Sequence, residues 1–295
     1  MRPVLFMLVL AACGDRAELR PDAGDPVPGD DLPTIGRIEI LETRAVYDGI
    51  ETPTGRVIGS FLDGPPPRWH RETMRAGACA LRVHTPSSCS PACASGLCND
   101  GECQRWASYV SAGTLTVQGL TTGVTIAPVD GWYYPPDSLP ANLFADTATV
   151  TARLTGGALP AMTLTTTGVP PLVAAIADGK VTIPYPAGTD FVIRWTPAAD
   201  DSRIRLTLNA NNQGHGFPFL AILECDVADS AGELAIPAAM LDAFPETFAS
   251  SICAGTDCPP SLLRRYHRAT QAVGEHAVEL VVASELQFGL EHDRP

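Results

Sequence analysis

The chain has 295 residues, of which 45% are hydrophobic, and its formal net charge is −13 at pH 7. This length is sufficient for one large domain or two modest domains, each with a buried core. The acidic balance repels phosphate backbones and no basic run interrupts it, so we expect no nucleic-acid partner.

The first thirteen residues predict export and lipid attachment. The apolar run from Val4 to Leu10 is far shorter than the ~20 apolar residues that span a bilayer, which is typical of a signal sequence. It ends in Leu10-Ala11-Ala12-Cys13, which resembles the lipobox of bacterial lipoproteins. The resemblance implies a signal peptide over residues 1–12, a lipid on Cys13 and a membrane partner bound through that lipid. The alternative is a chance apolar N-terminus followed by a cysteine.

The lipobox also implies a location in the cell envelope. In enterobacterial lipoproteins an aspartate directly after the cysteine favours the inner membrane. Here Gly14 takes that place and Asp15 comes one residue later, so we expect the outer membrane. Residues 13–34 are rich in Asp, Pro and Gly and predict a flexible tether, because they contain too little apolar surface to fold. The folded body then spans residues 35–295.

Short strand signals follow one another along this body. Polar and apolar residues alternate in Arg37–Glu42, Phe191–Trp195 and Arg203–Leu208, the pattern of half-buried strands. Further strands are expected at residues 55–61, 78–83, 113–117, 123–126, 148–154, 161–165, 180–183, 219–225, 233–236 and 276–282. Many short strands separated by Gly, Pro and Asn predict an all-β fold, an antiparallel β-sandwich that is one large unit or two packed ones. Two short helices are predicted after prolines, at residues 237–244 and 261–268.

The cysteines predict disulfides. Nine are present, and an even number remains once Cys13 is assigned to lipid, as expected for four disulfides in an exported protein. The remaining eight are Cys79, Cys89, Cys93, Cys98, Cys103, Cys225, Cys253 and Cys258. The segment around the middle four resembles a fragment of an EGF-like or similar small disulfide module, so we predict a cysteine-rich insertion at residues 86–105.

The pairing of these cysteines is only partly determined. Within the insertion we favour the interleaved pairs Cys89–Cys98 and Cys93–Cys103 over the other two arrangements and over a zinc site with four cysteine ligands. Cys253 and Cys258 lie close enough in sequence to close a small ring, which leaves Cys79 and Cys225 to join two sheets. The alternative pairs Cys225 with Cys253 or Cys258. We interpret the insertion as a stapled loop in preference to a recognition loop.

The best candidate for ligand binding is Trp132-Tyr133-Tyr134, beside Asp130. Flat aromatic faces with polar tips suit stacking on a sugar or gripping a peptide, so a glycan or protein ligand is the expected partner. The alternative, which we favour, is a loop whose aromatic side chains cover the end of the sandwich, since large aromatic residues are mostly buried.

Other groups of polar residues predict turns more strongly than chemistry. Asp226, Asp229 and Glu233 surround a turn with oxygen ligands that calcium prefers, but the spacing does not match an EF-hand, and we favour an ordinary hairpin turn. His215, between two glycines, is a weak candidate for a general base. No histidine metal motif, nucleophile elbow, phosphate loop or dinucleotide fingerprint is present. We therefore predict no catalytic residue, metal or cofactor.

The body also resembles predicted β-rich lipoproteins of GC-rich Gram-negative bacteria. This resemblance rests on the strand, turn, strand and helix that follow Cys225-Asp226 and on Ser111-Ala112-Gly113-Thr114, and it implies no activity. The sequence thus predicts an envelope lipoprotein with a non-catalytic binding or structural role. The alternative is an exported hydrolase or carbohydrate-active enzyme, which requires a cleft where carboxylates or a histidine converge with perturbed pKa values.

Overall fold

The computed structural model describes residues 32–47, 50–66, 68–85, 88–99, 101–135, 137–176, 179–184, 186–210, 220–245 and 261–293. Most of these residues lie in strands, as predicted. The strands are β1 (Thr34–Tyr47), β2 (Ile50–Phe61), β3 (His70–Ala76), β4 (Cys79–His84), β5 (Leu97–Asn99), β6 (Glu102–Gln104), β7 (Leu115–Gln118), β8 (Val124–Ile126), β9 (Trp132–Tyr133), β10 (Thr149–Leu154), β11 (Met162–Thr167), β12 (Lys180–Pro184), β13 (Phe191–Arg194), β14 (Arg203–Ala210), β15 (Ala221–Ala228), β16 (Glu233–Ile236), β17 (Ser261–Val273) and β18 (His276–Asp293).

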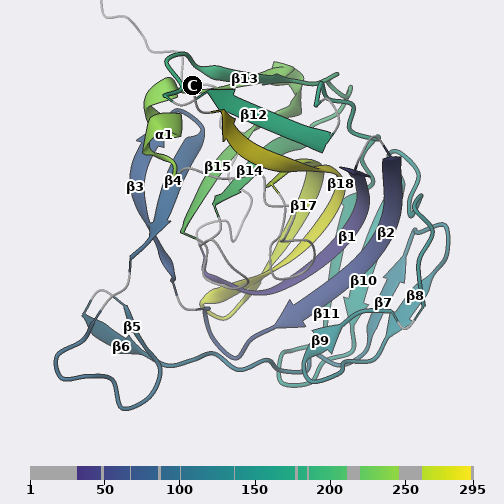
Figure 1. The fold of residues 1–295 in the computed structure, drawn as a ribbon. Coiled ribbons are helices and arrows are strands. Elements are labelled where there is room, and N and C mark those ends of the chain that lie inside the picture. The colour runs from purple at the N-terminus through teal and green to yellow at the C-terminus, as the bar shows by residue number, and fades with distance from the viewer. Residues whose placement is uncertain are drawn as a thin grey trace, which may run out of the picture.

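Ten strands form one large curved sheet (Figure 1). Their order is β3-β4-β15-β14-β17-β18-β1-β2-β9, and β12 adds to the far end of β18. Most neighbours are antiparallel, but β1 and β12 each pair with β18 in parallel. Parallel pairing brings together segments far apart in the chain, such as Arg37 and Glu279, which local sequence patterns cannot reveal.

One face of the large sheet is apolar and is covered by two separate layers. Ile38 and Ile40 of β1 pack against the four-stranded sheet β11-β10-β7-β8, which forms the first core. Leu206 of β14 belongs to a second core, which is closed by β12, the β13–β16 ribbon and the short helix α1 (Ala238–Ala243). The long strand β18 serves both cores, with Leu280 in the first and Phe288 in the second.

A polar seam lies on this face between the two cores. Arg265 of β17 is 2% exposed and forms an ion pair with the fully buried Asp229, with 3.1 Å between Nη2 and Oδ1. The same guanidinium donates hydrogen bonds to the carbonyl oxygens of Pro171 and Thr196. The hydroxyl of Ser284 accepts a hydrogen bond from the N–H of Leu172, so the crossing segment 170–172 is held to the sheet at several points.

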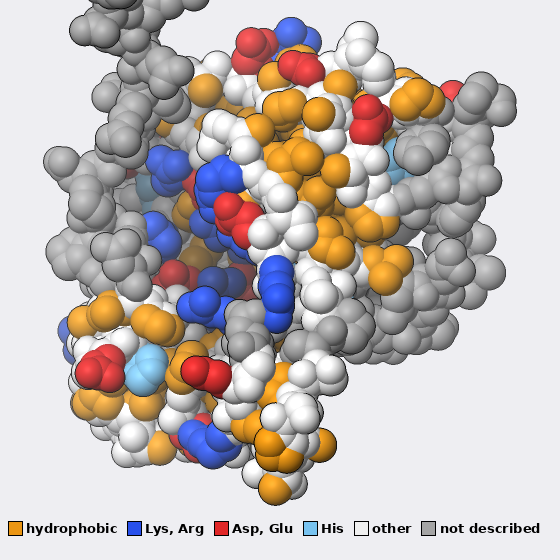
Figure 2. Space-filling view, turned by 90° about the vertical axis from the view of Figure 1, so that its left-hand side faces the viewer, with side chains coloured by type: hydrophobic (Ala, Val, Ile, Leu, Met, Phe, Trp, Pro, Cys, Tyr) orange, Lys and Arg blue, Asp and Glu red, His pale blue; other side chains and the backbone are white. Residues whose placement is uncertain are grey.

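The opposite face of the large sheet is mostly charged, with one small apolar cluster formed by Leu41, Tyr266, Val281 and Ala283. In the strand register, one row of side chains across this face comes from Asp226 of β15, Arg205 of β14, Arg264 of β17, Glu285 of β18 and Thr43 of β1. Their neighbours on the face include Arg37, Glu39, Arg56, Arg203 and Glu224. In the space-filling view of Figure 2, basic and acidic side chains gather around a hollow in the surface.

One of the two predicted helices is confirmed and the other is wrong. α1 begins directly after Pro237, as the proline predicted. Residues 261–268 instead begin β17, because pairing with β14 on one side and β18 on the other outweighs the local helix signal. Within the described ranges no helix has the length and apolarity to cross a bilayer.

A disulfide joins Cys79 to Cys225 inside the large sheet. The sequence predicts that this pair joins two sheets. The two residues instead lie directly opposite each other on β4 and β15, so the bridge fastens neighbouring strands of one sheet. The period-2 pattern placed both cysteines on strands but held no information on which strands pair. Cys253 and Cys258 lie outside the described residues.

We predict that this bridge contributes more to stability than a bridge in the insertion. It spans 146 residues of sequence, against 9 for Cys89–Cys98, and the chain-entropy model then assigns it an advantage of roughly 2 kcal/mol. Urea unfolding of the Cys79→Ala/Cys225→Ala and Cys89→Ala/Cys98→Ala variants measures the difference. Equal unfolding midpoints would contradict it.

Candidate functional site

The turn beside the predicted aromatic site has a simple structural basis. Asp130 and Gly131 both have positive φ, 52° and 80°, and the backbones of Val129 and Trp132 exchange hydrogen bonds of 2.8 and 2.9 Å. This is the two-residue Asp-Gly turn that connects antiparallel segments. Asp130 is therefore a turn residue, and its place beside the aromatics follows from backbone geometry.

The three consecutive aromatic residues point to alternate sides. Tyr133 is fully buried: its hydroxyl accepts a hydrogen bond from the N–H of Ala112 and donates one to the carbonyl of Gly113, each 2.8 Å long. Its ring meets Phe61 edge-on, with 5.3 Å between centroids. Tyr133 is thus a core residue, which corrects the prediction that it contacts ligand. Trp132 and Tyr134 are 37% and 53% exposed.

A tyrosine from another part of the chain completes this surface. Tyr109, itself 48% exposed, stacks on Trp132 with 4.5 Å between ring centroids and 41° between planes. It reaches this position because it forms a β-bridge with Leu62, just beyond β2. We call Tyr109, Trp132 and Tyr134 the aromatic ledge. No local pattern identified Tyr109, since it lies more than twenty residues upstream of Trp132.

The segment before Tyr109 carries a second aromatic pair. Trp106 is 46% exposed and lies 5.3 Å from Trp69 between ring centroids. The preceding residue, Arg105, forms an ion pair of 2.9 Å with Asp63 and thereby holds the segment against the chain that follows β2. The exit of the cysteine-rich insertion is therefore tied to the surface that carries the ledge.

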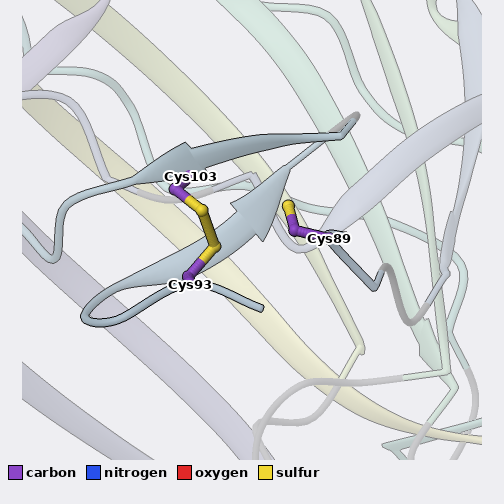
Figure 3. A group of neighbouring side chains, drawn as sticks. All are labelled: Cys89, Cys93 and Cys103. Carbon is purple, nitrogen blue, oxygen red and sulfur yellow. A yellow bond between two sulfur atoms is a disulfide. The ribbon is translucent and has the colours of Figure 1, made fainter. Parts of the chain in front are cut away.

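The insertion itself is a small hairpin, β5–β6, which projects from the edge of the body (Figure 1). Its disulfides are Cys89–Cys98 and Cys93–Cys103, the interleaved pairs that the sequence favoured. The sulfur atoms of Cys89, Cys93 and Cys103 lie within 4.8 Å of one another. Figure 3 shows the three side chains and the Cys93–Cys103 disulfide. Because each sulfur is in a disulfide, none is a thiolate, and the cluster is not a zinc site.

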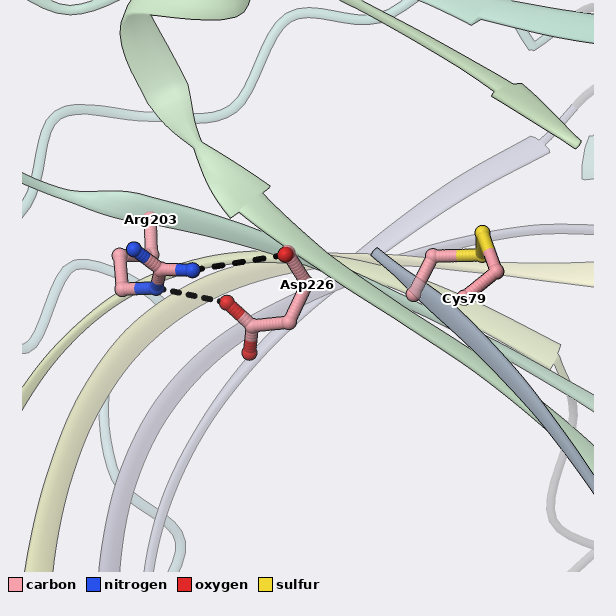
Figure 4. Close-up of a disulfide and its surroundings, with 4 residues drawn as sticks. Cys79, Arg203 and Asp226 are labelled. Carbon is pink, nitrogen blue, oxygen red and sulfur yellow. Dashed lines mark hydrogen bonds and ion pairs between the residues drawn. A yellow bond between two sulfur atoms is a disulfide. The ribbon is translucent and has the colours of Figure 1, made fainter. Parts of the chain in front are cut away.

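Asp226 lies between two arginines on the charged face, and Figure 4 shows its contact with one of them, Arg203. Nε of Arg203 is 2.6 Å from its Oδ1 and Nε of Arg205 is 2.8 Å from its Oδ2. The hydroxyl of Tyr266 donates to Oδ2 at 2.5 Å. Burial of the phenol is the main cause that raises the pKa of Tyr266 to about 12. The hydroxyl therefore stays protonated and acts as a donor.

The other two carboxylates of the predicted turn point elsewhere. Asp229 is buried against Arg265, whereas Glu233 pairs with Arg194 at 3.1 Å. Since all three carboxylates have separate arginine partners, they do not form a calcium site. The chain does turn here, through a 3-10 helix (Asp229–Ala231), but β16 pairs with β13 and not with β15, so the predicted hairpin is wrong.

A second charge network lies beside the Asp226 cluster. Arg264 contacts Glu285 and Glu39, both at 2.8 Å, and Glu285 is only 1% exposed. The hydroxyl of Thr43 also donates to Glu285 at 2.8 Å. Burial opposes ionisation of Glu39, but Arg264, Arg37 and Arg56 outweigh it and lower the pKa of this carboxyl below its ordinary value.

This arrangement does not favour acid–base catalysis. Carboxylates paired with arginine are held ionised and are poor proton donors near neutral pH. Burial raises the pKa of Glu42, but this carboxylate accepts hydrogen bonds from the backbone N–H groups of Leu143 and Phe144, which gives it a structural task. His215 lies outside the described residues. Comparison of the chain with protein families, curated proteins and solved structures found no match.

We predict that Arg264→Met destabilises the protein by about 3–5 kcal/mol at pH 7, because it leaves buried carboxylates without their partner. A lowered native pKa stabilises the folded state above the ordinary value of 4.5, and this contribution disappears as the pH falls through the native pKa. The difference in free energy of unfolding between wild type and Arg264→Met should therefore become smaller at acidic pH. Urea unfolding at pH 7 and at about pH 3.5 measures it.

The matched control is Arg194→Met, which breaks the ion pair with Glu233. Both side chains of that pair are more than half exposed, so the expected loss is only about 0–1 kcal/mol. An Arg264→Met deficit that is as small as the control, or that is constant with pH, would contradict the assignment.

Proposed function

We propose that this protein is a lipoprotein of the bacterial outer membrane that binds a glycan or peptide ligand without catalysis. Cys13 carries the lipid, residues 13–34 are the tether, and the β-rich body presents the aromatic ledge. The described disulfides support an oxidising compartment, as expected for an exported chain. The lipobox-like sequence at Leu10-Ala11-Ala12-Cys13 supports the anchor.

The aromatic ledge is the observation that carries the binding role. Tyr109, Trp132 and Tyr134 each expose more than a third of their surface, although aromatic side chains of this size are mostly buried. The Asp-Gly turn fixes the backbone at Trp132 and the ring of Tyr109 stacks on that of Trp132, so these two rings lose little conformational entropy when a ligand is bound. Exposed rings with polar tips offer both a stacking face and hydrogen bonds.

Binding is favoured over the alternative of an exported hydrolase by the state of the carboxylates. Asp226 and Glu285 are both held by arginines, and Asp229 is fully buried in the polar seam. Hydrolysis by paired carboxylates needs one group that is protonated at working pH and a reachable partner for it. The aromatic ledge needs no such pair.

The binding role is tested with glycan and peptide arrays that are probed with the full-length chain in detergent. We expect retention on one class of ligand, and a loss of affinity of at least about tenfold in Trp132→Ala/Tyr134→Ala, because exposed aromatic anchors dominate such interfaces. Val173→Ala truncates another exposed apolar side chain, 57% exposed, and should leave affinity unchanged. Equal affinity of the double variant and wild type would exclude the ledge as the binding surface.

The lipid anchor is tested by fractionation of cells that express Cys13→Ala. We expect this variant in the aqueous fraction and the wild-type chain in the outer-membrane fraction, because the apolar run before Cys13 is too short to hold the protein by itself. Immunoblots of both fractions measure the change. Recovery of Cys13→Ala with membranes in the same proportion as wild type would defeat the assignment.

A further inference from the structure

Two arginines on the charged face share one carboxylate. Arg203 and Arg205 both contact Asp226, and Tyr266 adds a hydroxyl donor to the same group. With the phenol neutral, these groups carry two positive charges and one negative charge, and the nearby Glu224, which also acts on Arg205, is balanced by its own ion pair with Arg82. Among the described residues, no acceptor faces the Nη1 group of either arginine. The cluster therefore keeps an excess positive charge and free N–H donors inside a chain whose net charge is −13.

The needs of the fold do not account for both arginines. Arg203 and the hydroxyl of Tyr266 already provide donors to both oxygens of Asp226, because Arg203 contacts Oδ1 and Tyr266 contacts Oδ2, the oxygen that Arg205 also contacts. Arg264, the next arginine across the sheet, differs in this respect: its three nitrogens are all engaged by Glu39 and Glu285. The Nη1 groups of Arg203 and Arg205 thus remain free to donate hydrogen bonds to a solute.

The free donors are held in place. Arg205 lies over the ring of Tyr266, with 4.9 Å from its central carbon to the ring centroid. Asp226 follows Cys225, whose disulfide to Cys79 fastens β15 to its neighbouring strand β4 (Figure 4). A guanidinium with a fixed orientation matches the two oxygens of a carboxylate or phosphate, and fixing it in advance lowers the entropic cost of binding.

The cluster is also accessible. The side chains of Arg203 and Arg205 are 36% and 25% exposed, so solutes reach them without unfolding. The hollow in Figure 2 has basic side chains around it. Arginine donors that are partly desolvated bind oxyanions more strongly than donors in open solvent.

We propose that Arg203 and Arg205 form a second ligand site, distinct from the aromatic ledge, that binds the carboxylate or phosphate group of a small anionic ligand. The bound oxyanion accepts hydrogen bonds from the free Nη groups and balances the positive charge that Asp226 leaves. The site binds and does not react, and it depends on neither the lipid anchor nor the ledge.

The test titrates inorganic phosphate or succinate into the full-length chain, with sodium chloride at matched ionic strength as reference. We expect a saturable rise in melting temperature and a calorimetric binding isotherm for at least one of the two anions. Tighter binding of phosphate would identify a phosphorylated ligand, and tighter binding of succinate a carboxylate ligand. The absence of saturable binding for both anions would overturn the proposal.

Arg203→Gln locates the site. It should weaken binding at least tenfold while the protein remains folded, because Asp226 keeps Arg205 and Tyr266 as partners. Arg194→Gln, which removes an exposed arginine with one carboxylate partner, should bind as wild type does. If the glutamine variant does not fold, Arg203→Lys replaces it, because lysine keeps the positive charge beside Asp226. This variant should bind succinate more weakly than wild type does, because lysine lacks the paired N–H donors of the guanidinium. Unchanged affinity for both anions in Arg203→Gln and Arg203→Lys would place the anion elsewhere.

Discussion

The buried ion pair between Arg265 and Asp229 is the contact on which the packing of the two cores depends. A charge as deeply buried as either of these costs several kcal/mol to desolvate, and the cost is offset only when the partner and the remaining hydrogen bonds are all in place. Arg265 fulfils this condition, since it also binds three backbone carbonyls of the crossing segments. The seam therefore fastens the segments at residues 170–171, 196 and 229 to one point of the large sheet.

The long strands divide their residues between two different environments. Glu39 and Thr43 of β1 belong to the charged face, while Ile38 and Ile40, on either side of Glu39, face the first core. The same division holds along β17 and β18. A one-residue slip would place carboxylates in an apolar core, so the register is strongly determined even though the sheet is large.

Both proposed sites arise from this division. The aromatic ledge forms where Tyr133 takes the core side of β9 and leaves Trp132 and Tyr134 outside. The arginine pair forms where alternate residues of β14 leave the second core and meet Asp226. In each case the buried neighbour fixes the exposed one, which gives a ligand a rigid surface to bind.

Local sequence patterns were sufficient for most of the strands, for α1 and for the paired cysteines of the insertion, but not for β3, β5, β6, β9 and β17. Alternation has a period of two residues and proline acts within one helical turn, so both signals are contained in a short window. The Asp130-Gly131 pair is an equally local signal for a tight turn, but Asp130 and Tyr133 were both predicted as ligand-binding residues. The lipid anchor on Cys13 also rests on local sequence alone, and it remains a prediction.

The remaining features required the folded chain. Arg265 meets Asp229 across 36 positions of sequence, and Tyr109 meets Trp132 only because β2 brings their segments together. The prolines before residue 261 predict a helix there, but pairing with the two neighbouring strands makes β17 extended. Such contacts are chosen by the free energy of burying whole faces, which is summed over the entire sheet and is not encoded in any short segment.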